Sequence, residues 1–433
     1  MKRTFALILG AVALGASAGQ AQQAITVVDL PPATAKSAFT FGAVLGIREV
    51  SGGKVLVNDA VRHQMKLLDS SLALVNTPLD SVPGLASSYG ARPLPLVRYL
   101  GDSSLTSDVE AGTLLMLGPG GQVARAVASP YVQSVPPYAN LTGMMRLNAT
   151  GVDDRGRILF QGYVPLTKPD MTVAERVAAL SRDTVLILRA DFESRRVDTV
   201  ARIRNAGTTA LMGRASEGGP VRFSSMPVSI VDVWAVLSDG TVGIVRGQDY
   251  HVDWISPDGT THSTSKLPFD WKRLTDEDKR RLIDSVRADQ VPRLGAAMAQ
   301  SQPRPQGSDA DAGGATAGAR TSVPREQGPP RPPMAVEYVP PALKDIPDYY
   351  PSVRMGAAMA DRDGNLWILP NSSAQSRQGE LVYDVINPQG SFRRVRLPVS
   401  RSIAGFGKDG VVYLLAGNRS IGFNMERTRL PRQ

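Results

Sequence analysis

The feature of this 433-residue chain that most constrains its fold is a hairpin that returns along the sequence. Each copy has a short apolar strand, a tight tip ending in glycine, and a second strand rich in Val, Ile, Leu or aromatic residues. The tip glycines of the clear copies are Gly53, Gly156, Gly240, Gly364 and Gly410. Glycine reaches the positive φ that tight hairpin turns need, and the flanking strands fix the register. The chain is therefore predicted to be all-β.

Several copies are followed by a second hairpin. Its tips fall at residues 118–121, 256–259 and 387–390, each between two apolar runs. Two hairpins in series make a four-stranded antiparallel meander, which is the blade of a β-propeller.

The spacing of the tips predicts how many blades there are. Successive tip glycines are 103, 84, 124 and 46 residues apart, and one blade needs roughly 40–50 residues. The first gap therefore holds a further blade, around residues 94–129, whose first hairpin is degraded. The next two gaps hold one blade each plus insertions. The sequence thus predicts a six-bladed β-propeller of four-stranded antiparallel blades.

The ring is predicted to be closed by the N-terminal strand. The strand-like residues 24–29 precede the first blade, and the last blade runs short of chain after Asn424. We expect residues 24–29 to pair with the C-terminal blade as its outer strand, which removes two open sheet edges.

An insertion is predicted at residues 270–345, between the fourth and fifth blades. Residues 275–278 resemble a capping box, and apolar residues at helical spacing predict an amphipathic helix at 275–288 that packs on the propeller. Residues 291–333 are rich in Pro, Gly, Ala, Gln and Ser. Such a composition cannot bury enough apolar surface to offset its ordering entropy, so this stretch is predicted to be a disordered linker.

The N-terminus predicts export. Lys2 and Arg3 precede an apolar run at 5–14 and small residues at 16–21, the pattern of a secretory signal peptide over residues 1–21. The apolar run is too short to cross a bilayer, and no later run reaches the ~18 residues of a membrane span. We therefore expect residues 22–433 to form the mature protein, periplasmic or extracellular and without a transmembrane anchor.

Composition excludes some chemistry. The chain has no cysteine, which rules out thiol catalysis, cysteine zinc sites and iron–sulfur clusters. Its net charge of +9 comes mainly from arginines scattered among acids. Without a basic block this pattern argues against nucleic acid and favours an anionic envelope surface or polysaccharide.

Residues 44–68, which include the strand exit at 59–64, and residues 359–369 resemble the broad superfamily of six-bladed propellers. That superfamily includes NHL-repeat, strictosidine-synthase-like and gluconolactonase-like proteins, and the chain also looks like exported bacterial propellers that have no assigned role. The resemblance covers nearly all of the mature chain. It implies, for lactonase-type members, acidic and amide metal ligands around the channel. That ligand set has no residue-by-residue match in this sequence, so no site is carried over.

One set of arginines recurs at matching places. Arg146 and Arg354 each lie ten residues before a tip glycine, and Arg401 lies nine before one. Equal offsets place them at the start of the innermost strand in three blades, near the channel mouth. Guanidinium groups suit carboxylate or phosphate, so we predict that Arg146, Arg354 and Arg401 bind an anionic ligand or an acidic peptide loop. The alternative is chance in an arginine-rich chain, or pairing with carbonyls at blade edges.

Other motifs favour structural interpretations. Asp249, His251 and Asp253 share one face of a predicted strand, which suits a metal or acid–base cluster but also the polar outer face of a blade, and the second interpretation is favoured. His63 is assigned to a loop between strands. Residues 263–266 match S-x-x-K without its partner motifs, and 361–365 lack the glycine of a calcium loop and are assigned to a hairpin tip.

Two functions remain open. The leading one is a non-enzymatic binding or scaffolding module without a cofactor, for an anionic small molecule, a polysaccharide or a protein partner. We expect a monomer that does not bind nucleic acid. The alternative is a metal-dependent hydrolase or lactonase that uses the central channel, with a divalent cation such as Ca²⁺ and with Glu49, Asp153 and Asp232 as the nearby acids.

Overall fold

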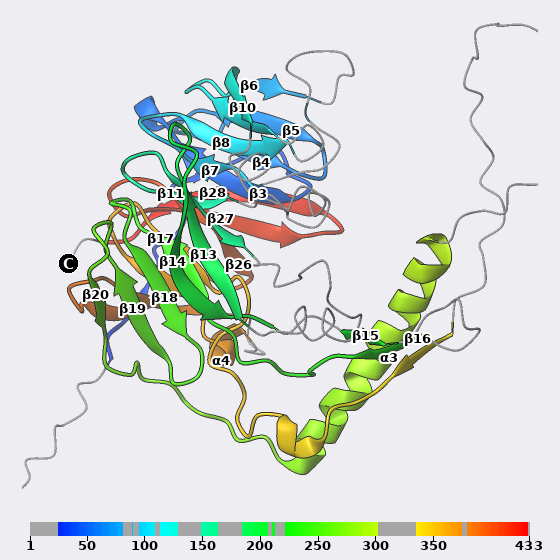
Figure 1. Ribbon diagram of the computed structural model, residues 1–433. Coiled ribbons are helices and arrows are strands. Elements are labelled where there is room, and N and C mark those ends of the chain that lie inside the picture. The colour runs from blue at the N-terminus through cyan, green and yellow to red at the C-terminus, as the bar shows by residue number, and fades with distance from the viewer. Residues whose placement is uncertain are drawn as a thin grey trace, which may run out of the picture.

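The computed structural model describes residues 25–80, 89, 95–108, 113–128, 149–162, 184–206, 210–212, 221–301, 335–374 and 379–431. The signal peptide predicted at residues 1–21 lies outside these residues. Within them, six sheets are arranged around a central axis, and a long helix stands to one side (Figure 1). The protein is a six-bladed β-propeller, as its hairpins predict.

Each blade is an antiparallel meander, and we number the blades in chain order. Blade 1 contains β3 (Val44–Glu49), β4 (Val55–Asp59), β5 (Gln64–Leu68) and β6 (Leu74–Leu79). Blade 2 contains β7 (Val97–Arg98), β8 (Ser104–Asp108), β9 (Thr113–Leu117) and β10 (Val123–Ala128). Blade 3 contains β11 (Ala149–Val152), β12 (Ile158–Gly162), β13 (Thr184–Ala190) and β14 (Val197–Arg204). Blade 2 is the blade with the degraded first hairpin, and it lies where the spacing predicts.

The other three blades follow the same order. Blade 4 contains β17 (Val233–Val236), β18 (Val242–Arg246), β19 (His251–Ile255) and β20 (Thr261–Ser263). Blade 5 contains β22 (Ala358–Ala360), β23 (Leu366–Ile368), β24 (Val382–Ile386) and β25 (Phe392–Arg396). Blade 6 contains β26 (Arg401–Phe406), β27 (Val411–Asn418) and β28 (Gly422–Arg429). The first strand of each blade contacts the first strand of a neighbouring blade, so these strands form the inner ring.

The hairpin tips explain the recurring Gly and Asp residues. Gly156, Gly240 and Gly364 have φ values of 80, 89 and 86°, the left-handed conformation that the turns require. At the tips of blades 3 and 5, Asp153 and Asp361 each accept backbone N–H groups from residues two and four positions later. The aspartate thus holds the turn closed while the glycine reverses the chain.

The core lies between the blades rather than within one layer. Val55 and Val57 of β4 pack in a cluster with Tyr413 of blade 6, whereas Leu56 packs in a cluster with Leu96 and Leu117 of blade 2. Successive side chains of a strand point to opposite faces, so each blade contributes to two interfaces. Similar clusters join blades 2 and 3, blades 3 and 4, and blades 4, 5 and 6.

The N-terminal segment closes the ring, as predicted, but with different residues. β2 (Ala35–Lys36) pairs antiparallel with β28 and completes blade 6. β1 (Val27–Asp29), which was predicted to take that place, pairs parallel with β25 as a fifth strand of blade 5. The contacts around β2 explain the difference, because Ser37 and Thr34 also hydrogen bond to the backbone of blade 6.

The insertion contains a longer helix than the sequence predicts. Helix α3 (Asp276–Ser301) begins with the predicted capping box, in which Thr275 and Asp278 hydrogen bond to each other. It continues thirteen residues beyond 288, so the first part of the predicted disordered linker 291–333 is helical. Val291 and Leu294 extend its contact face, which explains why the helix does not stop earlier. Residues 302–333 of the linker lie outside the described residues.

The helix was predicted to pack on the propeller, but α3 packs instead against a small separate sheet. This sheet has the order β15 (Ala210–Met212), β16 (Val221–Ser224) and β21 (Val336–Tyr338). Ile283 of the helix packs with Phe223, Tyr338 and Ile346, next to the 3₁₀ turn η4 (Leu343–Asp345). Short segments η1 (Ser51–Gly53) and α4 (Asn371–Ala374) belong to blades 1 and 5. In the described part of the chain, no helix combines the length and the apolar character needed to cross a bilayer.

Candidate functional site

The inner strands of all six blades line a central channel with a cavity of about 430 Å³. Most described side chains along its wall are apolar or small. The charged ones come from the C-terminal ends of the inner strands or from the tips that follow them: Arg48, Glu49, Arg98, Asp361 and Arg362. One end of the channel is therefore charged, and we call it the tip end because the first hairpin of each blade turns there.

Arg48 is the most deeply buried of these basic side chains. It lies near the end of β3 and is only 3% exposed. Its two Nη atoms donate to the carbonyl oxygens of Glu49 and Gly101. Its Nε atom is buried and has no hydrogen-bond partner among the described residues. A buried guanidinium group with an unused donor is costly, so this residue needs an explanation beyond packing.

Two further arginines lie beside Arg48. The Glu49 carbonyl accepts from Nη1 of Arg48 at 2.9 Å and from Nη1 of Arg362 at 3.1 Å, so two guanidinium groups share one oxygen atom. Arg98, the last residue of β7, donates to the carbonyl of Ser238 at 3.4 Å, and the Ser238 hydroxyl contacts the carbonyl of Arg362. We call Arg48, Arg98 and Arg362 the arginine cluster.

The cluster is electrostatically unfavourable as it stands. Burial, followed by the positive charges of Arg362 and Arg98, lowers the pKa of Arg48 to about 10. Partial burial, followed by the charge of Arg362, also lowers the pKa of Arg98. Two carboxylates offset the charge in part, since Asp102 and Glu49 both act to raise the pKa of Arg48. Among the described residues, the two cations Arg362 and Arg98 therefore act on Arg48 more strongly than the two anions do.

Both carboxylates are already used by the fold. Asp102 accepts the backbone N–H of Ser51 at 3.0 Å. Glu49 accepts the N–H of Lys408 at 3.0 Å and the hydroxyl of Tyr413 at 2.7 Å, and it lies 3.8 Å from Arg362. Since β3 alternates its side chains, Glu49 points toward blade 6 while Arg48 points toward blade 2. An additional anion at this end of the channel would relieve the repulsion between the guanidinium groups.

The arginines predicted from equal offsets are not the ones that cluster. Arg146 lies outside the described residues. Arg354 is exposed and precedes β22, while Arg362 follows that strand, so the two lie at opposite ends of it. Arg401, the first residue of β26, forms a bidentate ion pair with Glu426 at 2.7 and 3.1 Å. The binding role of Arg146, Arg354 and Arg401 stays a prediction.

Sequence reasoning missed the arginine cluster because its members sit at unequal offsets. Arg48 precedes its tip glycine by five residues, Arg98 precedes Gly101 by three, and Arg362 precedes Gly364 by two. The available signal was a different one, namely an arginine next to the first hairpin tip in three separate blades.

The acids nominated for a hydrolase lie apart from one another. Glu49 bonds to blade 6, as described above. Asp153 accepts a hydrogen bond from the side chain of Arg157 at 2.7 Å, in addition to those from the backbone N–H groups of its own turn. Asp232 accepts the N–H groups of Arg204 and Gly247 and the side chain of Arg246. Among the described residues, no three His, Asp or Glu side chains are grouped so that they could hold a metal ion.

The histidines lie away from the channel. His251 contacts Asp249 at 2.8 Å and Asp253 at 3.1 Å on β19, so the three side chains share a face as predicted. Asp253 is also bound by Ser263 and Arg246, which makes this a hydrogen-bonded outer face of blade 4. His63 has a positive φ of 52° in the turn between β4 and β5, and His262 contacts the carbonyl of Pro388.

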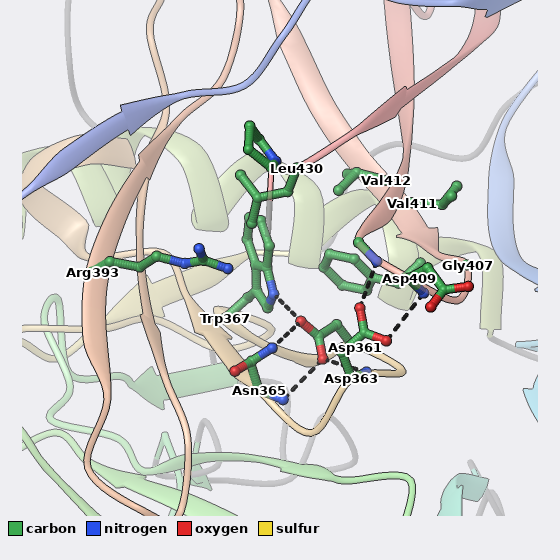
Figure 2. A pocket seen from close by; sticks show the side chains of 13 residues that line it. Asp361, Asp363, Asn365, Trp367, Arg393, Gly407, Asp409, Val411, Val412 and Leu430 are labelled. Atoms are coloured by element: carbon green, nitrogen blue, oxygen red, sulfur yellow. Dashed lines mark hydrogen bonds between the residues drawn. The ribbon is translucent and has the colours of Figure 1, made fainter. Parts of the chain in front are cut away.

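A second cavity, of about 390 Å³, lies between blades 5 and 6 (Figure 2). Asp361 accepts hydrogen bonds there from Asn365 and from the indole nitrogen of Trp367, in addition to those of its turn. Asp363 accepts the backbone N–H groups of Asp409 and Gly410 at 3.1 and 2.6 Å. The dashed lines in Figure 2 show that Asp363 links the tips of blades 5 and 6, whereas Asp361 bonds within blade 5. Residues 361–365 therefore form a hairpin tip, as predicted, and join the two blades.

The fold and the channel define the class of this protein as a six-bladed propeller with a basic tip end. No known family model matches the sequence, and no curated protein matches it either. Among solved structures, the chain is similar to a streptogramin B lyase, with 12% identity, a TM-score of 0.34, and coverage of 92% of this chain and 86% of that chain. It is also similar to a protein from Bacteroides fragilis described as exported, with 9% identity, a TM-score of 0.43, and coverage of 94% of this chain and 100% of that chain. A third similar structure is a gluconolactonase from Xanthomonas campestris, with 12% identity, a TM-score of 0.36, and coverage of 91% of this chain and 88% of that chain. Similarities this weak say nothing of function, and the fold assignment rests on the strand pairing.

Proposed function

We propose that the protein is an exported, non-enzymatic binding module that takes up an anionic ligand at the tip end of its central channel. The observation that carries this proposal is the arginine cluster, in which Arg48 is 3% exposed and its buried Nε donor has no partner in the part of the chain that the structure describes. The predicted signal peptide supports export.

The chemistry of the cluster favours a carboxylate or phosphate. Arginine presents planar N–H donors that match both groups, and it keeps its charge when partly buried. The apolar channel wall strengthens the field of the three guanidinium groups compared with open solvent. A bound anion would balance the excess positive charge that Asp102 and Glu49 leave.

A binding role is favoured over a hydrolase because the acids of the alternative are committed elsewhere. Glu49, Asp153 and Asp232 each accept several hydrogen bonds from the protein, and each holds a different part of the fold. No specific observation favours the hydrolase.

The test is isothermal titration calorimetry of the full mature chain with sodium phosphate and with sodium acetate at low salt. We expect one anion per protein and a large fall in affinity when the salt concentration is raised. Arg98→Gln should weaken binding about tenfold or more, because a hydrogen bond from a charged donor contributes roughly 1.5–3 kcal/mol. Arg98 lines the channel but keeps much of its side chain open to solvent, so this variant should fold normally.

The matched control is Arg222→Gln, which removes the same charge from an exposed arginine paired with Glu337 on the small separate sheet. It should bind the anion as the unmodified protein does. Equal affinity of the Arg98→Gln and Arg222→Gln variants, or no anion binding at all, would overturn the proposal.

A further inference from the structure

The lining of the channel changes along its axis from charged to apolar residues. Every charged side chain that lines it in the described residues is at the tip end. Away from that end the wall consists of apolar or small residues, with Thr150 as the polar exception. The larger of these apolar side chains are Leu45, Ile47, Leu96, Trp234 and Met359.

The apolar section is too large for a small ion alone. The cavity measures about 430 Å³, whereas a water molecule takes up roughly 30 Å³ of liquid. A phosphate or acetate ion at the arginine cluster would leave most of the channel without ligand contacts. Cavities of several hundred Å³ with an apolar wall and a few convergent polar groups are typical of sites for organic ligands.

The strands also set the length of this section. Leu45 to Ile47 on β3 and Trp234 to Val236 on β17 each cover three residues of wall beyond the tip end. At about 3.3 Å per residue, this gives roughly 10 Å of apolar wall along the axis.

We infer that the ligand of this channel is an amphipathic anion, with a carboxylate or phosphate head at the arginine cluster and an apolar chain along the wall formed by Leu45, Ile47 and Trp234. The inference rests on the proposed anion site and specifies the chemistry of what occupies the rest of the channel. Head and tail would then be recognised by different strands of the same ring. Chain length, rather than charge alone, would determine affinity.

The experiment is a titration of the mature protein with straight-chain carboxylates of increasing length: acetate, butanoate, hexanoate and octanoate. Each added methylene group that enters the wall should raise the affinity roughly fourfold. The rise should end once the chain fills the roughly 10 Å of wall. The fluorescence of Trp234, which lines the channel and is 8% exposed, should change on binding of octanoate but not of acetate.

Two variants separate this inference from the proposed anion site. Val236→Thr places a hydroxyl group on the wall with little change of shape, and it should weaken octanoate severalfold while leaving acetate unchanged. Val75→Thr, at a half-exposed position on β6, is the control and should change neither. Trp234→Phe should remove the fluorescence change and so assign it to the channel.

Each outcome decides one of the two statements. If acetate and octanoate bind with equal affinity, and both are weakened by Arg98→Gln, the amphipathic ligand is excluded while the anion site stands. If octanoate binds more tightly than acetate but is unaffected by Arg98→Gln, the proposed function is overturned. If the affinity rises with chain length, and Arg98→Gln lowers the affinity for every carboxylate of the series, both the anion site and the amphipathic ligand are supported.

Discussion

Arg48→Met should make the unliganded protein more stable. Arg48 is held in a buried position beside Arg98 and Arg362, and one of its donors is unused. Met has an unbranched side chain that can follow the arginine stem as far as the Nε position without carrying charge. The substitution therefore removes a buried cation and keeps most of the packing.

The size of the effect follows from opposing contributions. Burial and the neighbouring cations lower the pKa of Arg48 from 12.5 to about 10, so the fold disfavours the charged group by roughly 3 kcal/mol. Against this, Met loses the hydrogen bonds to the carbonyls of Glu49 and Gly101, each about 1 kcal/mol net. The Glu49 carbonyl keeps its bond from Arg362, and exposed Gly101 can bind water, so little more is lost. We expect a gain of about 1–2 kcal/mol in the free energy of unfolding.

Urea denaturation in a phosphate-free, non-carboxylate buffer measures this change. Arg222→Met is the control, and it should alter the free energy of unfolding by less than about 0.5 kcal/mol because its ion pair is exposed. Adding phosphate should stabilise the unmodified protein and the Arg222→Met variant but not Arg48→Met. A loss of more than about 1 kcal/mol for Arg48→Met would refute the reasoning, since Arg48 would then contribute to the fold rather than to a ligand site.

Three other predictions concern the fold. Tyr250→Phe should lower the free energy of unfolding by about 2 kcal/mol in urea denaturation. The reason is that the buried Tyr250 hydroxyl donates to the buried Asp384 carboxylate at 2.6 Å and joins blades 4 and 5. A loss below about 0.5 kcal/mol would contradict this. Ser37→Ala should lower the free energy of unfolding by about 1–2 kcal/mol in the same measurement. The buried Ser37 hydroxyl accepts the backbone N–H of Met425 at the point where the ring closes. An unchanged denaturation midpoint would show that this contact contributes nothing to ring closure. Burial raises the pKa of Tyr383 from 10.0 to about 12. Its contribution to the free energy of unfolding should therefore be intact below pH 10 and fall by roughly 2.7 kcal/mol between pH 10 and about 12. Tyrosinate absorbance should show Tyr383 ionising at higher pH than exposed tyrosines, and ionisation at the usual pH would exclude the shift.

The number and order of blades could be predicted because the hairpin tips are determined locally. Gly156 and Gly364 occupy conformations that few other residues adopt, and each lies between strands of clear alternation. Ring closure was predicted less well. β2 has only two residues and therefore shows no periodicity of its own. Its place in blade 6 depends on contacts between residues far apart in the sequence, such as that of Ser37 with Met425.

The small separate sheet could not be predicted for a similar reason. β16 and β21 pair in parallel although more than a hundred residues lie between them, and each is too short to show a pattern. The length of α3 depends on that sheet, because Val291 and Leu294 are held by contacts with it. Local composition, with Pro292 inside the helix, predicted an earlier end.

The candidate site shows which part of a ligand-binding site the sequence can reveal. The prediction of arginines near the channel followed from the ring geometry, and its choice of Arg354 and Arg401 assumed that equal offset means equal role. Arg401 has a full carboxylate partner in Glu426, whereas the clustered arginines come from unequal offsets and share partners. Which arginines meet depends on how the tips of blades 1, 2 and 5 converge.

Two adjacent residues of β3 differ in what they do: Glu49 holds the fold together, and Arg48 belongs to the proposed ligand site. The Glu49 carboxylate is satisfied by the N–H of Lys408 and by Tyr413, whose pKa is raised by burial and by that hydrogen bond, and it fastens blade 1 to blade 6. Arg48 faces the other way and remains incompletely satisfied. If charge at this end of the channel served stability alone, the buried guanidinium group would have a carboxylate partner as close as the one that Arg401 has. Under the proposed function, the bound anion would supply the partner that Arg48 lacks among the described residues.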